Sequence, residues 1–378
     1  MEMKYVENPR LNGKVARVIE ELKKEIISRF HPKSIILAGS FGRGEATVIE
    51  ENGKLKFLSD CEVILIPYKW IFSRRKIEEF EGNFYRKTGL KVEIWGFTPT
   101  LYLSLPFLNR KIRPTIANFD LKYGSKVIYG KDYLKKIPDF KPEDIPVWEG
   151  IRLLFNRMAE ALEYFSFENP SDEMLFWTDK IILACQDSLL LTLGKYHHSY
   201  RKRNELLQEL FPMYLKDVQK DVPNFLELAV KSTNRKLKGA TNVDDPVRYW
   251  FDISKVCDKV FRYIMKQSGI EFTDYIELVN KSTKHQGGIK SHIYNLIALL
   301  KFLVIHKHLP SLKVFRKRQM IYSLILLCYF GLDNEKYLKK CSEILSTFGL
   351  NSPSTCYSLR QLLNQVIYLW ERYILMRD

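Results

Sequence analysis

Apolar segments of strand length occur only in the first part of this chain, and this asymmetry restricts the folds open to it. Each such segment is followed within two residues by Gly or Pro, the usual boundary of a strand. They lie at 34–38, 61–66, 91–97 and 127–129. Apolar residues at helical spacing occupy 12–29 and 76–87, before and between them. Strands and helices that alternate along the chain predict an α/β or α+β domain here.

The pattern changes after a stretch that contains Pro138, Pro142 and Pro146, which stiffen the chain. From Ile151 onward the apolar residues follow helical spacing, with almost no strand-like alternation. Helices are predicted at 151–162, 172–194, 203–217, 245–268, 289–308, 318–331, 335–348 and 357–376. We therefore predict an α+β chain whose domains span 1–140 and 141–378, the second of them all-α.

Composition places the chain among globular proteins. It has 378 residues, 46% of them hydrophobic, so it can form two or three domains with sizeable cores. Residues 1–10 are polar and do not resemble a signal peptide, and no apolar run is long enough to span a membrane. Six scattered cysteines form no Cys-x-x-Cys pair, which indicates reduced thiols in cores rather than zinc ligands. We expect a cytoplasmic protein with no membrane partner.

The chain carries a formal net charge of +16. An excess of this size favours polyanionic partners such as nucleotides, RNA or DNA. A lysine-rich solvated surface explains the charge equally well, because no single basic block dominates the sequence. The charge therefore leaves a nucleic-acid partner possible without requiring one.

The residues that can carry chemistry adjoin two of the predicted strands. The segment Ala38–Glu45, AGSFGRGE, begins with a Gly-Ser turn whose backbone N–H groups can bind an anion. Asp60 and Glu62 stand one residue apart at the start of a strand, so their side chains point to the same face. Neighbouring carboxylates repel unless a cation lies between them, and Mg²⁺ prefers carboxylate oxygens. Cys61, between the two acids, is expected on the opposite face of the sheet. A phosphate cradle beside a metal-binding pair indicates nucleotidyl transfer.

A third acid, Glu93, lies between Val92 and Ile94 on the strand at 91–97. A carboxylate in such an apolar strand is costly to bury, so a partner must compensate its charge. A metal ion can do so, and so can a neighbouring lysine or arginine.

Taken together, these residues resemble the DNA polymerase β-type nucleotidyltransferase superfamily. The resemblance rests on the turn GSFGRGE, the acidic pair in SDCEV and the later strand LKVEIWGF, and it covers roughly residues 30–130. The sub-pattern, a Gly-Ser-x-Gly-Arg turn with Glu as the second acid and a Lys-Val-Glu strand, is similar to that of kanamycin nucleotidyltransferase-like enzymes. Gly-Ser alone carries little information, and the combination is what gives the resemblance its specificity.

The connection from Glu45 to Leu58 is longer than the family's usual one. Residues 47–49 and 55–57 flank an Asn-Gly pair, which predicts an inserted β-hairpin. This departure affects the alignment between the Gly-Ser turn and the first acid, and leaves the carboxylate pair itself unchanged.

The resemblance implies a polymerase β-like mixed sheet in residues 1–140 and a helical domain that closes a nucleotide cleft. It also implies Mg²⁺ or Mn²⁺ as cofactor and ATP or another NTP as substrate. The catalytic and metal-binding residues that it implies are Asp60, Glu62 and Glu93. The nucleotide-binding residues that it implies are Gly39 and Ser40, which hold phosphates, and Arg43, which faces the triphosphate.

The expected reaction moves an NMP, with AMP from ATP as the first expectation, onto a hydroxyl acceptor and releases pyrophosphate. Glu93, or an acid of the helical part such as Glu160, accepts the hydroxyl proton. A small-molecule acceptor is slightly favoured by the motif, whereas an RNA 3′ end fits the charge and a protein side chain fits a toxin or regulator. A catalytically inactive nucleotide- or RNA-binding module is the alternative that is not an enzyme.

The helical part offers weaker candidates. Charged or polar residues on otherwise apolar helices are better explained by structural salt bridges than by catalysis. They are Asn156, Arg157, Lys180, Gln186 and Asp187. The segment 196–203 mixes aromatic and basic side chains, which can stack on bases and contact phosphates, although a solvated helix start explains it better.

Overall fold

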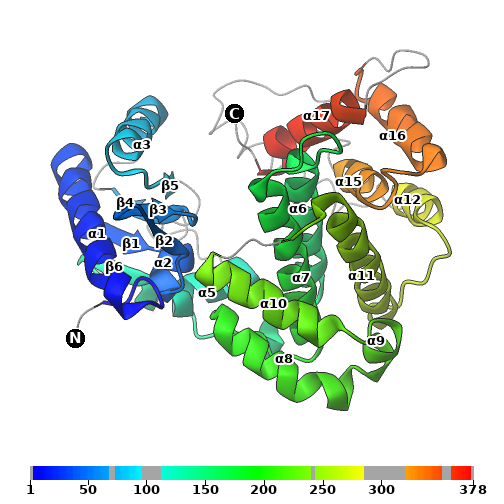
Figure 1. Ribbon diagram of the computed structural model, residues 1–378, viewed down its shortest axis with the longest axis horizontal. Helices are drawn as coiled ribbons and strands as arrows, with labels where there is room; N and C mark the ends of the chain where they lie inside the picture. The colour runs from blue at the N-terminus through cyan, green and yellow to red at the C-terminus, as the bar shows by residue number, and fades with distance from the viewer. Residues whose placement is uncertain are drawn as a thin grey trace. The chain divides into compact units, whose positions relative to one another are not determined.

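The computed structural model describes residues 3–67, 73–95, 112–239, 243–284, 320–350 and 359–375 (Figure 1). Its architecture is the predicted α+β one, with a mixed four-stranded sheet in the N-terminal part. Within the described ranges every strand ends by Gly130, and the later residues are largely helical. The change of hydrophobic pattern near residue 150 therefore marks a real change of architecture.

The sheet consists of β1 (Ser34–Leu37), β4 (Cys61–Ile66), β5 (Val92–Trp95) and β6 (Lys126–Gly130), in the order β5-β4-β1-β6. Strand β1 is antiparallel to both β4 and β6, whereas β4 and β5 are parallel. All four strands were predicted from the sequence. Residues 96 and 97, the end of the strand predicted at 91–97, lie outside the described residues.

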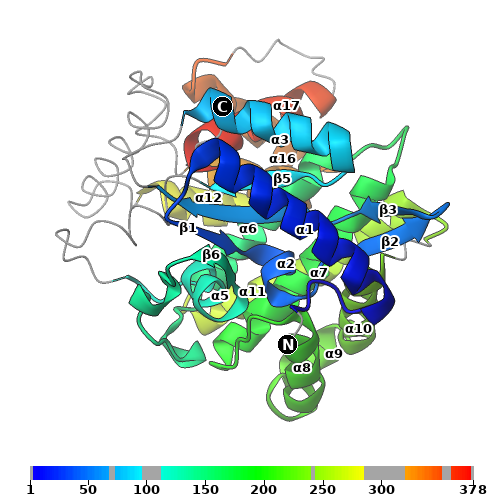
Figure 2. The same cartoon turned by 90° about the vertical axis from the view of Figure 1, so that its left-hand side faces the viewer.

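Two apolar layers cover the two faces of this sheet. On one face, the sheet is covered by α1 (Pro9–Phe30) and α3 (Arg74–Thr88) (Figure 2). These helices pack on strand residues such as Cys61 and Val63. On the other face, α5 (Ile116–Gly124) and the turns after β6 pack on residues such as Ile36 and Ile64. Because strand side chains alternate, odd positions of β4 belong to the first layer and even positions to the second.

Helix α1 begins three residues before the predicted start at 12. The side chain of Asn8 accepts a hydrogen bond from the backbone N–H of Arg10, and Pro9 occupies the first turn. An Asn cap followed by Pro is a strong signal for a helix start. The helix ends where His31 adopts a left-handed conformation, with φ of 45°.

The inserted hairpin is present as predicted. It consists of β2 (Val48–Glu51) and β3 (Lys54–Phe57), which pair antiparallel in a sheet of their own. Asn52 and Gly53 both have positive φ, 52° and 76°, as a two-residue type I′ turn requires.

Helices occupy most of the later residues, joined at first by the 3₁₀ turns η1 (Leu134–Lys136) and η2 (Pro142–Asp144). The helices that the sequence predicted are α6 (Trp148–Tyr164), α7 (Asp172–Thr192), α8 (Tyr200–Tyr214), α11 (Pro246–Gln267), α15 (Met320–Phe330), α16 (Glu335–Thr347) and α17 (Leu359–Trp370), which continues into the π-helical η3 (Glu371–Leu375). Among the described residues, the sequence did not predict the helices α5, α9 (Lys216–Asp221), α10 (Phe225–Lys238) and α12 (Tyr275–Lys284). The helix predicted at 289–308 lies outside the described residues.

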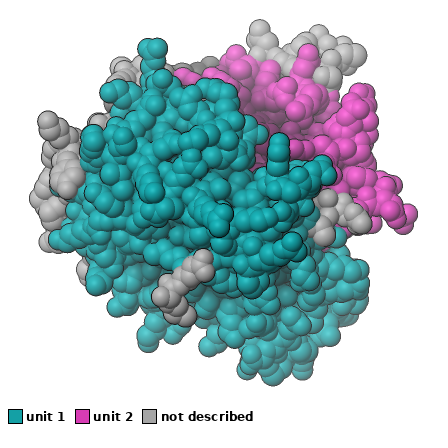
Figure 3. Space-filling view, turned by 60° about the vertical axis from the view of Figure 1, so that its left-hand side comes forward, with its two compact units in different colours: residues 1–150, 186–242 teal, residues 151–185, 243–378 magenta. Residues whose placement is uncertain are grey.

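The chain forms two compact units, coloured separately in Figure 3. Unit 1 contains residues 1–150 and 186–242, and unit 2 contains residues 151–185 and 243–378. Unit 1 therefore includes the sheet together with α8, α9 and α10. The domain boundary proposed near residue 140 stays a prediction.

Unit 2 is built around a cluster of aromatic residues. Trp250 packs against Phe165 and Tyr329, with ring centroids 4.7 and 4.9 Å apart. Five buried cysteines of the described residues are free thiols, as expected, and Cys356 lies outside the described residues. None of the described helices is both long enough and apolar enough to cross a membrane.

Candidate active site

Two of the three predicted acids lie side by side on neighbouring strands of the sheet. Glu62 of β4 and Glu93 of β5 are partners in the parallel register. Their sequence neighbours Cys61, Val63 and Ile94 belong to the layer under α1 and α3, so both acids point to the opposite face. Both residues are half-buried, and Glu93 also has the ammonium of Lys91 at 3.3 Å. Like charges on adjacent strands are unfavourable, which makes this pair a natural place for a cation.

Asp60 immediately precedes β4 and is half-buried. Cys61, between the two acids, is fully buried on the opposite face, as predicted. Burial raises the pKa of the Cys61 thiol, and the charges of Asp60 and Glu62 raise it further. The thiol is therefore not a nucleophile or metal ligand at neutral pH, whereas the two acids gather negative charge at the start of β4.

The Gly-Ser segment contacts the acidic strand directly. The backbone N–H of Ala38 donates a hydrogen bond of 2.9 Å to the carbonyl oxygen of Glu62. Gly39 has φ of +58°, and a Cβ added there would lie 2.7 Å from Cδ of Glu62 and still closer to its Oε1. The Glu62 carboxylate therefore lies against the Cα of Gly39, an approach that only glycine permits.

The predicted turn at Gly39 is a single helical turn, α2 (Gly39–Arg43), with Gly44 in a left-handed conformation after it. Ser40 is buried, with 7% of its surface exposed. The structure thus brings Gly39 and Ser40 to the end of β1, beside the strand that carries Glu62. Their binding of phosphate stays a prediction.

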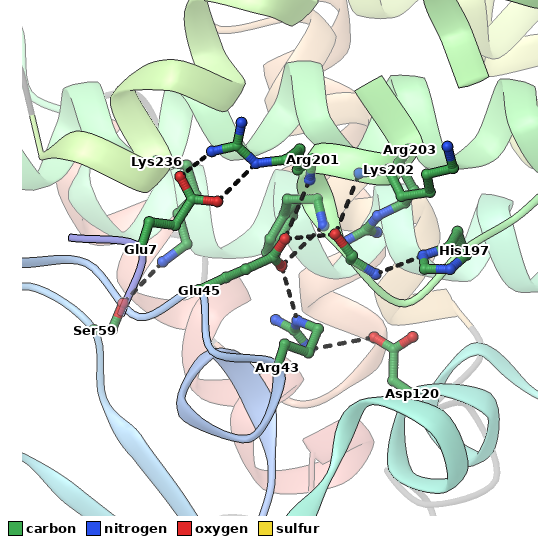
Figure 4. Close-up of polar contacts among 12 residues, drawn as sticks. Glu7, Arg43, Glu45, Ser59, Asp120, His197, Arg201, Lys202, Arg203 and Lys236 are labelled. Carbon is green, nitrogen blue, oxygen red and sulfur yellow. Dashed lines mark hydrogen bonds and ion pairs between the residues drawn. The ribbon is translucent and has the colours of Figure 1, made fainter. Parts of the chain in front are cut away.

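Arg43, predicted to face a triphosphate, lies in a buried ionic network. Only 9% of its side chain is exposed, and its guanidinium nitrogens lie 3.5 Å from Asp120 and 3.6 Å from Glu45 (Figure 4). It also stacks over the ring of Tyr200, 5.1 Å from the centroid. These partners give Arg43 a structural function, and any contact with a nucleotide stays a prediction.

The network continues from Asp120 into the helices of unit 1. Tyr196 donates a hydrogen bond of 3.0 Å to Asp120, and Arg203 donates one of 3.2 Å to the Tyr196 hydroxyl. Arg203 in turn pairs with Asp187. Burial raises the pKa of Asp120, and the charges of Arg43 and Arg203 only partly offset it. The aromatic and basic residues of the segment 196–203 are thus partly internal.

The remaining cations of that segment are paired at the surface. Arg201 forms a two-pronged ion pair with Glu7, and Lys202 donates a hydrogen bond of 2.9 Å to Glu205. The segment begins α8, and the hydroxyl of Ser199 caps the helix by accepting from the N–H of Lys202. These contacts agree with the simpler of the two predictions, a helix start.

Glu45 joins the Gly-Ser segment to the start of α8. Its carboxylate accepts hydrogen bonds from the Ser199 hydroxyl at 2.6 Å, the Tyr200 N–H at 2.9 Å and the Arg201 N–H at 3.3 Å (Figure 4). Burial alone raises the pKa of Glu45, but these hydrogen bonds and the charge of Arg43 outweigh it and lower the pKa overall. The carboxylate also lies at the N-terminus of α8, where the positive end of the helix dipole stabilises a negative charge.

We expect Glu45→Gln to destabilise unit 1 by about 2–4 kcal/mol at pH 7, because it removes a buried charge from its hydrogen-bond donors. The folded pKa is below the unfolded value, so this stabilisation is present above about pH 4.5 and is lost as the pH falls through the folded pKa. Urea unfolding at pH 7 and pH 3 measures both effects. The matched control is Glu205→Gln, which breaks an exposed ion pair on α8, the helix whose start Glu45 contacts. This change is expected to alter stability by less than about 1 kcal/mol. Equal urea midpoints for the Glu45 variant and wild type at pH 7 would contradict the assignment.

The candidates on the helices of unit 2 have local partners. Arg157 pairs with Glu160, and Asn156 accepts a long hydrogen bond of 3.4 Å from the indole of Trp370. Lys180 lies 3.7 Å from the ring centroid of Trp177, a cation–π contact. These contacts favour a structural function for these residues, as the sequence suggested, and leave Glu160 as an acceptor of the hydroxyl proton untested.

Trp95 belongs to the strand segment LKVEIWGF, and the sequence assigned it no function. Trp95 follows Glu93 by two positions on β5 and therefore points to the same face of the sheet. It is 41% exposed, which is high for tryptophan. The alternation of side chains along the strand was the signal that could have identified it. An exposed indole beside the acids can stack on a base or a sugar ring.

No trio of His, Cys, Asp or Glu side chains in the described ranges lies close enough to hold a metal ion. The structure thus places Glu62 opposite Glu93 and Asp60 two residues before Glu62, without forming a ready set of three ligands. Any ion at this position depends on further oxygens, such as those of a nucleotide.

Comparison of the chain with models of protein families, with curated proteins and with solved structures found no match. The interpretation of the site therefore depends on its residues and geometry.

Proposed function

We propose that this protein is a metal-dependent nucleotidyltransferase. It transfers an NMP, with ATP as the expected donor, to the hydroxyl of an acceptor and releases pyrophosphate. The observation that carries the proposal is one arrangement on one sheet face. Glu62 lies opposite Glu93, its carboxylate lies against Gly39 of the Gly-Ser segment, and Asp60 precedes it by two residues.

The chemistry of the donor set fits Mg²⁺ or Mn²⁺. Mg²⁺ is commonly held by one or two protein carboxylates together with substrate phosphates, so a complete protein cage is not required. Asp60 and Glu62 would hold one ion, and Glu93 would contribute to a second. When bound, such ions neutralise the phosphates and stabilise the attacking and leaving oxygens of an in-line displacement.

The protein's own residues position the substrates and take the proton. The acceptor oxygen forms a bond to the α-phosphorus while the bond between that phosphorus and the leaving oxygen breaks, which releases pyrophosphate. Glu93 is our candidate for accepting the hydroxyl proton, because it lies on the same face as Glu62 and is half-buried. Gly39 and Ser40 contact the phosphates, and Trp95 is available to stack on a ring of either substrate.

A small hydroxylated molecule is the favoured acceptor. The motif supports it, and two exposed cations of the most nucleic-acid-like segment, Arg201 and Lys202, are already paired with Glu7 and Glu205. The net charge of +16 supports an RNA 3′ end as the alternative, and a protein side chain is the third possibility. A binding module without turnover is the alternative that is not an enzyme, and the presence of all three acids, Asp60, Glu62 and Glu93, argues against it.

Incubation with α-labelled NTPs and Mg²⁺ tests the proposal, with aminoglycosides, RNA and a cell extract as acceptors. We expect label on an acceptor together with released pyrophosphate. Calorimetric titration of ATP with Mg²⁺ separates the alternatives, because a binding module takes up ATP without releasing pyrophosphate. The proposal would be overturned if the protein neither binds nor transfers any NTP.

The favoured acceptor leads to a further prediction about RNA. We expect tRNA to bind weakly at physiological salt and the affinity to stay unchanged in an Arg201→Ala, Lys202→Ala double variant. Arg203 is left intact because it is buried against Asp187. If RNA is the acceptor, affinity instead falls steeply with salt, by roughly a thousandfold for about six phosphate contacts. Filter binding over a series of salt concentrations distinguishes the two, and tight binding lost in the double variant would reverse our ranking.

A further inference from the structure

A buried lysine of α10 reaches the chain just before Asp60. Lys236 is 7% exposed, and its ammonium donates a hydrogen bond of 3.1 Å to the Thr47 hydroxyl. It donates a second, of 3.0 Å, to the Ser59 hydroxyl (Figure 4). The Thr47 hydroxyl donates in return to the carbonyl oxygen of Lys236. A buried ammonium is unfavourable unless it is hydrogen-bonded, so the Lys236 ammonium depends on these hydroxyl acceptors.

Thr47 and Ser59 close the base of the inserted hairpin. The N–H of Thr47 donates to the Ser59 hydroxyl at 2.9 Å, and the N–H groups of Leu58 and Ser59 donate to the Thr47 carbonyl at 3.0 and 3.2 Å. Ser59 is adjacent to Asp60 in the chain, so whatever fixes Ser59 also limits where the Asp60 carboxylate can lie.

The end of α10 packs on the same place. Gly239 caps the helix with φ of +74°, and a Cβ added there would lie 2.9 Å from Leu58, 3.0 Å from Ile49 and 3.2 Å from Thr47. The helix end and the hairpin base thus touch independently of the Lys236 hydrogen bonds. The packing brings the helix end to the hairpin base, and the ammonium adds the hydrogen bonds that fix the Thr47 and Ser59 hydroxyls.

We propose that Lys236 is a positioning residue that sets the orientation of Asp60 through Ser59. The inference rests on the proposed function for its catalytic consequence, whereas its structural part concerns only the hairpin base. A small displacement of a catalytic group is costly: a shift of about 1 Å can lower a rate by about 10²-fold. Loss of a residue that supports a metal ligand typically lowers metal affinity or activity by about 10–100-fold.

The test compares Lys236→Met, which keeps length and loses the donors, with Lys238→Met, an exposed lysine of the same helix. We expect hydrogen exchange at the amides of Leu58 and Ser59 to rise about tenfold in the Lys236 variant only. We expect kcat to fall by about 10–100-fold and the Mg²⁺ requirement to rise, with little change in KM for ATP. Ser59→Ala, a milder change at the hairpin base, is expected to reproduce the fall in kcat should Lys236→Met fold poorly.

The outcomes separate this inference from the function. Unchanged exchange at the hairpin base overturns the positioning function, whatever the activity. Faster exchange with an unchanged kcat in both Lys236→Met and Ser59→Ala shows that Lys236 holds the hairpin without positioning Asp60. This result also overturns the positioning function. A wild-type protein that transfers no nucleotide, while the Lys236 variant shows faster exchange, overturns the proposed function and leaves the hairpin contact standing.

Discussion

Replacement of Asp60 by Asn, or of Glu62 by Gln, is expected to lower nucleotidyl transfer by about 10³-fold or more while the fold survives. The reason is that metal-ion stabilisation of phosphoryl charge supplies several kcal/mol, and each 1.36 kcal/mol changes the rate by about tenfold. Both changes keep side-chain shape and remove one negative charge. Both residues are half-buried, so the sheet does not depend on them for its core. Release of pyrophosphate measures the activity, and urea unfolding checks the fold.

The matched control for these variants is Glu79→Gln. Glu79 lies on α3, is 60% exposed and pairs with Arg29 at the surface, so the same chemical change there is expected to leave activity unaltered. A steeper dependence on Mg²⁺ in the Asp60 and Glu62 variants, and not in the control, ties the loss to the ion. Full activity of Asp60→Asn would remove its assignment as a metal ligand.

Local signals predicted most of the N-terminal fold. Each strand of the sheet is a short apolar run with a Gly or Pro nearby. The hairpin was predicted from the Asn52-Gly53 pair, which adopts the positive φ angles that a type I′ turn requires. The faces of the sheet could also be predicted, because alternation places Cys61 and Glu62 on opposite sides. These features depend on neighbours within a few residues, which the sequence displays directly.

Contacts between distant residues could not be predicted in the same way. Lys236 and Thr47 are 189 positions apart, and the helix that carries the lysine was itself missed. The assignment of residues 186–242 to the unit of the sheet also depends on such contacts. A single sequence shows that a lysine and a threonine exist, but not that chain folding brings them together.

Arg43 illustrates the ambiguity of a charged residue in a motif. Its place after the Gly-Ser pair suggested a triphosphate contact, whereas the structure surrounds it with Asp120, Glu45 and Tyr200. The acids were visible in the sequence, but nothing marked them as partners of this arginine. The choice between a ligand and an internal ion pair is decided by tertiary structure, where burial makes unpaired charge unfavourable.

Gly39→Ala is expected to lower transfer by about 10²-fold or more with only a modest loss of stability. The added methyl group meets the end of the Glu62 side chain, its Cδ at 2.7 Å, so the carboxylate has to move. Because that group is the far end of a flexible side chain, the sheet can stay intact while the acid is displaced. Displacement of a reacting group by about 1 Å is enough for an effect of this size. The left-handed backbone of Gly39, with φ of +58°, adds a cost of about 1 kcal/mol.

Gly53→Ala separates the two causes. Gly53 also has positive φ, +76°, but nothing lies within 4 Å of an added Cβ, so its substitution carries the backbone cost without the collision. We expect both variants to lose about 1 kcal/mol in urea unfolding and only Gly39→Ala to lose activity. Activity retained by Gly39→Ala, or lost equally in both, would mean that the contact between Gly39 and Glu62 does not matter for transfer. Because the contact joins the Gly-Ser segment to the acidic strand, this pair of variants tests whether the two halves of the motif act as one site.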